Sequence, residues 1–329
     1  GSSYFYDSFV QEYNGVHRAM GNPQLGLYIL AVSMTCNTFL NWVFIFGNLG
    51  APRMGVEGAA LATLLARVLS CAIAVGWAVL DREFKLDPVL LFRPGGEMVR
   101  RFVRFSTPVM CNETFWGLGS SLFPTIMGHM EGSEEILAAY AIAGNITNLC
   151  TVGVFAIAGT AAILVGQEIG SGRADQVRSL GALLDVLAFL FGIAAGGAFL
   201  ALLHLLMIPV LYPLFKLTPS AGDICTMMLT MVFLLLPLRS FDTTNIVGVL
   251  RGGGDVKMAT VIDLAPLWVV ALPIAALAGL VFRLGIFWVY LGMMSESLVK
   301  SFVGLWRFRS GKWIRDVTLP DLREAGRQS

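Results

Sequence analysis

Apolar residues in this chain come in long blocks separated by short polar segments, and this pattern restricts the fold more than any other feature. The blocks cover residues 25–46, 56–80, 105–129, 136–167, 182–213, 224–250, 259–282 and 284–306. A hydrocarbon core about 30 Å thick requires helices of about 20 apolar residues. Because 56% of the 329 residues are hydrophobic and 14% are charged, we predict an all-α polytopic membrane protein with eight complete transmembrane helices.

The residues before the first block predict part of a further helix. Aromatic residues between positions 4 and 13 are spaced as in an amphipathic helix, without the basic segment and apolar core of a signal peptide. We therefore expect the chain to begin partway through a transmembrane helix.

Lys and Arg are concentrated in alternate loops and in the C-terminal tail. The opposite loops contain only Arg53, Lys216 and Arg283. Because basic residues are retained on the cytoplasmic side of a membrane, we predict a cytoplasmic C-terminus.

An internal repeat links the two halves of the chain. The segment Arg18-Ala19-Met20-Gly21-Asn22 matches Arg251-Gly252-Gly253-Gly254-Asp255 at an offset of 233 positions, and two apolar blocks follow each copy. We infer a parent protein of about 12 helices in two pseudo-symmetric bundles, of which the first three helices and part of a fourth are missing here. The expected parts are a remnant of the N-terminal bundle (1–80), a cytoplasmic linker (81–104), a C-terminal six-helix bundle (105–307) and a cytoplasmic tail (308–329).

Three carboxylates are predicted at nearly the same membrane depth. Glu113 lies nine residues after Arg104, Asp242 nine before Arg251 and Glu296 eleven before Arg307. With these basic residues as anchors, the spacings correspond to about 14 to 16 Å of helix. Asp263 is six residues from Lys257 and is expected to be shallower. Because ionisable groups inside a membrane are costly, such residues are candidates for a functional site.

Polar and aromatic neighbours extend this candidate site. Asn112 and Trp116 are spaced i,i+4 beside Glu113, so a carboxylate, an amide and an aromatic ring could hold an organic cation. The residues Arg239, Asp242 and Asn245 follow one another at i,i+3 spacing after Pro237, a residue that permits a helix bend.

Simpler interpretations remain open for several of these charges. Arg239 and Asp242 could neutralise each other, and Glu296 and Lys300 could pair at i,i+4 spacing. Lys300 could also extend to the membrane surface. Asp185 is expected to be interfacial.

Catalytic and metal-binding motifs are not found in the sequence. The five cysteines fall inside apolar blocks and the three histidines are far apart, without the spacing of a metal site or a nucleophile–base pair. With 23 basic and 22 acidic residues, no overall charge favours nucleic acid as a partner. We therefore expect no enzyme activity, no cofactor, no metal centre and no nucleic-acid partner.

Several segments together resemble the multidrug and toxic compound extrusion (MATE) family of transporters. The resemblance rests on Arg18 to Pro23, Gly55 to Thr63, Gly166 to Gly172, Gly248 to Asp255 and Trp306 to Trp313. It implies secondary active efflux of organic, often cationic, compounds by antiport with sodium ions or protons. MATE proteins use acidic groups on the first and fourth helices of the C-terminal bundle, which implies roles for Glu113 and Asp242, including transient sodium binding.

The resemblance also implies a setting and an alternative. We expect a monomer in the lipid bilayer of a bacterial inner membrane, with a small organic molecule as substrate. The same superfamily contains flippases of lipid-linked oligosaccharides, which need several cationic side chains to meet a pyrophosphate. Only Arg67, Arg239 and Lys300 are basic residues deep in predicted spans, so we favour efflux.

Overall fold

The computed structural model describes residues 2–20, 22, 24–80, 95–214 and 217–315. The chain divides into two compact units, residues 1–99 and 100–329. In the first unit, helices follow the apolar blocks closely: α1 (Ser2–Ala19), α2 (Gln24–Phe46), the short turn η1 (Asn48–Gly50) and α3 (Val56–Leu80). Its small core contains Val10, Tyr13, Leu25, Ile29, Ala74 and Ala78.

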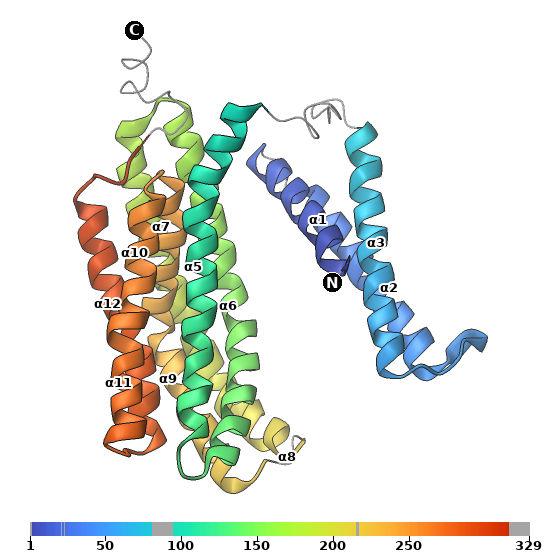
Figure 1. The fold of residues 1–329 in the computed structure, drawn as a ribbon, viewed down its shortest axis with the longest axis vertical. Helices are drawn as coiled ribbons and strands as arrows, with labels where there is room; N and C mark the ends of the chain where they lie inside the picture. The colour runs from blue at the N-terminus through green and yellow to red at the C-terminus, as the bar shows by residue number, and fades with distance from the viewer. Residues whose placement is uncertain (1, 21, 23, 81–94, 215–216, 316–329) are drawn as a thin grey trace. The chain divides into compact units, whose positions relative to one another are not determined.

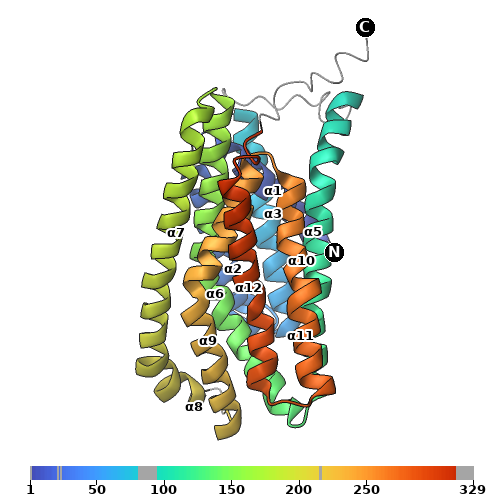
Figure 2. The same cartoon turned by 90° about the vertical axis from the view of Figure 1, so that its left-hand side faces the viewer.

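The second unit is a bundle of helices that run in similar directions in both views (Figures 1 and 2). Its elements are α5 (Gly96–Gly128), α6 (Ser133–Gly170), α7 (Ala174–Leu202) with η2 (Leu203–Leu211), α8 (Tyr212–Leu214), α9 (Pro219–Thr243) with η3 (Thr244–Leu250), α10 (Val256–Pro266), η4 (Leu267–Ala271), α11 (Leu272–Ala276), η5 (Leu277–Val281) and α12 (Ile286–Arg309). Seven helices among the described residues are long and apolar enough to cross a membrane. The predicted all-α membrane architecture is therefore confirmed.

Helix α5 differs from the prediction in its extent and polarity. The linker was expected to continue to residue 104, but α5 already begins at Gly96 and has Glu97 in its first turn. It is an eighth long helix of the described residues, yet it is not one of the seven sufficiently apolar ones. Hydropathy could not detect its start, because four of the nine residues 96–104 are charged. Residues 81–94, the rest of the expected linker, lie outside the described residues.

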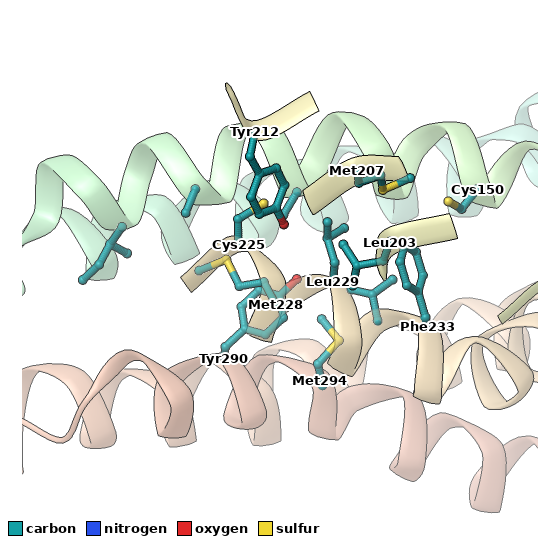
Figure 3. Close-up of a cluster of buried hydrophobic side chains, with 14 of the residues drawn as sticks. Cys150, Leu203, Met207, Tyr212, Cys225, Met228, Leu229, Phe233, Tyr290 and Met294 are labelled. Carbon is teal, nitrogen blue, oxygen red and sulfur yellow. The ribbon is translucent and has the colours of Figure 1, made fainter. Parts of the chain in front are cut away.

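Helix α9 is the centre of the bundle and lies against α6, α7 and α12. Around it, the side chains of Leu203, Leu229, Phe233 and Met294 belong to one buried apolar cluster, part of which is drawn in Figure 3. Small residues allow the end of this helix to approach α6 closely. A Cβ atom on Gly248 would lie 2.8 Å from the carbonyl oxygen of Ala158, so the two backbones pack in direct contact.

Two prolines precede π-helical segments in the second half of the bundle. Pro237 lies in α9, seven residues before the π-helical segment η3, and Pro266 immediately precedes the π-helical segment η4. A proline lacks the N–H group needed for the regular i→i−4 hydrogen bond, and π-helical turns are often found at functional sites. These segments adjust which side chains face the bundle interior.

The repeat expected from sequence places a helix break at each copy. In the first copy α1 ends at Ala19 and α2 begins at Gln24, and in the second α10 begins at Val256. Gly21, which the repeat aligns with Gly254, lies outside the described residues. The symmetry between the halves stays a prediction.

The beginning of the expected cytoplasmic tail folds onto the bundle. Trp313 is fully buried and stacks on Phe308. The carboxylate of Asp255 accepts a hydrogen bond from Nε of Arg307 at 2.7 Å and lies 3.4 Å from Nη2 of Arg315. Residues 316–329 of the expected tail are outside the described residues.

Candidate functional site

A cavity of about 110 Å³ lies inside the second unit, among five of its long helices. It collects residues from α5, α6, α9 with η3, α10 and α12. The lining residues are Asn112, Glu113, Trp116, Phe155, Arg239, Asp242, Thr243, Ile246, Val247, Asp263, Glu296, Ser297 and Lys300. Seven of the eight residues proposed from sequence are therefore brought together, and the exception is Asn245.

A buried lysine organises the acidic groups on one side of the cavity. The Nζ atom of Lys300 lies 2.9 Å from Oδ1 of Asp263 and 3.7 Å from Oε2 of Glu296. The other oxygen of Asp263, Oδ2, accepts a hydrogen bond from Nδ2 of Asn112 at 2.9 Å. Asp263 was expected to be shallower than the other carboxylates, but it lines the same cavity and links α5, α10 and α12.

Glu113 occupies a different environment from Asp263. Its side chain is 65% exposed, and its Oε1 atom lies 3.7 Å from Nη1 of Arg251. The same guanidinium lies 3.4 Å from Oδ2 of Asp263. The same Oε1 atom accepts a long hydrogen bond from Nδ2 of Asn112 at 3.5 Å, so Glu113 is held by two long contacts and remains accessible.

Asp242 is almost completely buried beside the cavity, with 4% of its surface exposed. The hydroxyl of Thr243 donates to its Oδ1 atom at 3.2 Å, whereas Oδ2 has no hydrogen-bond partner within the described structure. The described residues contain no ion pair between Arg239 and Asp242, so the simple neutralisation considered from sequence is not the arrangement seen. The alternative pairing of Glu296 with Lys300 is present, but Asp263 is the nearer partner.

Asn245 does not belong to the cavity, contrary to the sequence analysis. Its Nδ2 atom donates to Oδ2 of Asp185 on α7 at 2.7 Å. The reason is the π-helical segment η3, which begins at Thr244. Its hydrogen bonds span five residues, so the angle between successive side chains changes and i,i+3 residues no longer share a face. The side chain of Asp185, which was expected to be interfacial, is buried within the bundle at 4% exposure, and its depth in the membrane stays a prediction.

Two basic residues at the site received other assignments in the sequence analysis. Lys300 lies seven residues before Arg307 and Asp263 six after Lys257, so their similar depth could have predicted the pair. Arg251 was counted as a cytoplasmic anchor, and no sequence signal indicated that its side chain reaches Asp263.

Within the described residues, no three His, Cys, Asp or Glu side chains are grouped as metal ligands.

Comparison with known proteins identifies the fold and the family. Residues 108–277 match the MatE family model. The chain is 26% identical to a probable multidrug resistance protein NorM of Thermotoga maritima, over 95% of this chain and 65% of the relative. It is 29% identical to a probable NorM protein of Rhodopseudomonas palustris, over 89% of this chain and 62% of the relative. The chain thus spans less than two thirds of the length of these relatives.

Solved structures agree at the level of the fold. A MOP superfamily transporter from Pyrococcus furiosus aligns with a TM-score of 0.80 at 23% identity, covering 94% of this chain and 68% of that one. The Vibrio cholerae MATE transporter VcmN, in the bent form, aligns with a TM-score of 0.77 at 17% identity, covering 94% and 67%. Since the family model matches just over half of the residues, this multi-pass membrane chain belongs to the MatE family, whose members are transporters rather than enzymes.

Proposed function

We propose that this chain acts in secondary active export of organic, often cationic, compounds in exchange for sodium ions or protons. We further propose a bacterial inner-membrane location, a cytoplasmic C-terminus and a monomeric state. The carboxylate cavity of the second unit is the proposed binding site of the coupling cation.

The observation that carries this proposal is a set of buried oxygen atoms without hydrogen-bond donors in the cavity. Oδ2 of Asp242 and Oδ1 of Asn112 are buried and accept no hydrogen bond from the described residues. Oε2 of Glu296 also accepts none, and its 3.7 Å ion pair with Lys300 is long. Buried acceptors without donors are costly. A proton or a small cation would satisfy them.

The size of the cavity favours the coupling cation over a whole organic substrate. Its volume of about 110 Å³ is well below the roughly 300 to 1,000 Å³ typical of pockets for drug-sized ligands. It suits a cation with a little water, or the charged end of a larger molecule. Trp116 lines the cavity and is 38% exposed, so its ring can support such a positive charge by cation–π contact.

Competition for the carboxylates provides the exchange mechanism. Glu113 is accessible, and Asp242 has an unpartnered oxygen; both attract positive charge when they are deprotonated and free of metal. Occupation by a proton or sodium ion removes that attraction for a cationic substrate. Two ligands that exclude each other in this way are coupled in free energy, and the coupling is reciprocal.

A flippase of lipid-linked oligosaccharides is the alternative function. It is supported by the basic side chains of Arg239 and Lys300 in the cavity wall. Lys300, however, is bound to Asp263, and the lining contains four carboxylates. A pyrophosphate would meet repulsion there, so we favour export of cations.

Transport in lipid vesicles tests the proposal. The parent protein inferred from the sequence repeat, which contains this chain and the expected further helices, is reconstituted in vesicles loaded with a fluorescent organic cation, and a sodium gradient, a proton gradient or no gradient is imposed. We expect dye movement that depends on one of the two gradients. Movement of a fluorescent lipid-linked oligosaccharide, with no gradient-driven movement of the dye, would instead support the flippase.

A further inference from the structure

A second buried polar centre lies outside the cavity, between α7 and the π-helical segment η3. Asp185 and Asn245 are 4% and 0% exposed, and the amide Nδ2 donates to Oδ2 of the carboxyl group at 2.7 Å. A Cβ atom on Gly304 of α12 would lie 2.8 Å from Oδ1 of Asn245. The centre is therefore enclosed by three helical segments.

This hydrogen bond leaves the pair with two unsatisfied oxygens. Oδ1 of Asp185 and Oδ1 of Asn245 are both buried and have no hydrogen-bond partner among the described residues. Both atoms are acceptors when the aspartate is ionised, so they cannot bind each other. One additional hydrogen would supply the missing donor.

No basic side chain in the described structure forms an ion pair with Asp185. The charged groups of the neighbouring helices bind other partners or line the cavity. On α12, Lys300 binds Asp263 and Arg307 binds Asp255. On α9, Asp242 and Arg239 line the cavity. Glu168 at the end of α6 pairs with Arg173, and Arg178 of α7 donates to the carbonyl of Arg309. An ionised Asp185 would therefore be a buried and uncompensated charge, which proteins avoid.

We propose that Asp185 and Asn245 form a proton-binding site that is separate from the cavity. This site holds one proton on the aspartate while α7 and η3 are packed together. The Asp185 Oδ1–H group donates to Oδ1 of Asn245, while Nδ2 of Asn245 donates to Oδ2 of Asp185. The resulting acid–amide pair joins α7 to η3 by two hydrogen bonds and leaves no net charge. Loss of this proton leaves a buried anion, so deprotonation requires α7 and η3 to separate and admit water or a cation.

Infrared spectroscopy of the purified chain at neutral pH tests this proposal without requiring transport. A protonated carboxyl group has a carbonyl stretch that a carboxylate lacks. We expect the wild-type spectrum to contain one such carbonyl band that the spectrum of Asp185→Asn lacks. The matched control Asp175→Asn removes an exposed aspartate of the same helix and should lose carboxylate bands only. Loss of carboxylate bands in Asp185→Asn would overturn the proposal.

A second variant covers the case in which Asp185→Asn does not fold. In Asn245→Ala the carbonyl oxygen of the protonated acid no longer accepts the amide hydrogen bond. We expect its band to remain and to shift to higher wavenumber. If no acid band shifts and carboxylate bands change instead, Asp185 is ionised and the proposal is wrong.

Discussion

The pair between Asp263 and Lys300 allows the stability of the cavity to be predicted in detail. Their charged atoms are 2.9 Å apart, and the side chains are 16% and 8% exposed. With an effective dielectric constant of about 20, unit charges at this distance attract by about 6 kcal/mol. In Asp263→Asn, relief of the aspartate's own desolvation and the remaining attraction of Glu296 to Lys300 offset part of this loss. We expect the free energy of unfolding to fall by about 3 kcal/mol, the lower end for breaking a buried pair.

The assay is unfolding of the purified chain in mixed micelles, followed by circular dichroism. Two matched variants of the same cavity serve as controls. Glu113→Gln removes a carboxylate that is 65% exposed and should cost less than about 1 kcal/mol. Glu296→Gln removes the partner of Lys300 that lies 3.7 Å away rather than 2.9 Å and should cost less than Asp263→Asn. In the double variant Asp263→Asn/Lys300→Met, removal of both charges should recover part of the loss, with a coupling energy of about 1 to 3 kcal/mol. Equal losses in Asp263→Asn and Glu113→Gln, or strictly additive effects in the double variant, would refute the reasoning.

Two further variants test the charge of Asp242 and the packing of Trp313. Asp242→Asn should weaken transport of cationic compounds at least about tenfold more than transport of neutral ones, a difference of about 1.4 kcal/mol. Competition between compounds in dye-loaded vesicles measures this difference. Equal weakening would show that the charge of Asp242 does not discriminate between substrates. Gly253→Ala should destabilise the bundle by about 1 to 3 kcal/mol, because the added Cβ would lie 2.3 Å from the ring of Trp313. The control Gly144→Ala, with no atom within 4 Å of the new Cβ, should leave the melting temperature unchanged or raise it.

The sequence predicted the helices and most of the cavity because both depend on simple regularities. Apolar blocks of membrane-spanning length specify helices, and counting residues from basic anchors placed Glu113, Asp242 and Glu296 at one depth. Side-chain direction was predicted less well. An α-helical register puts Asn245 beside Asp242, whereas the π-helical turn at Thr244 directs it to Asp185.

Long-range contacts formed by flexible side chains were also beyond the sequence analysis. Arg251 was read as an anchor at a helix end, but its guanidinium lies within 4 Å of carboxylates on α5 and α10. The start of α5 was missed because a charged helical turn gives the same hydropathy signal as a loop. Both errors concern polar residues at helix ends, where apolar patterning carries little information.

Gradient-driven efflux by the Glu113→Gln variant tests whether this carboxylate couples cation entry to export. Glutamine keeps the shape of the side chain and removes its charge, and the exposed position of Glu113 predicts a folded, inserted protein. In vesicles loaded with a fluorescent organic cation, the wild-type parent protein that contains this chain should export the dye in response to an imposed proton or sodium gradient. Glu113→Gln, with an unchanged unfolding curve, should lose this gradient-driven export. Export at the wild-type rate by the folded variant would remove Glu113 from the exchange mechanism.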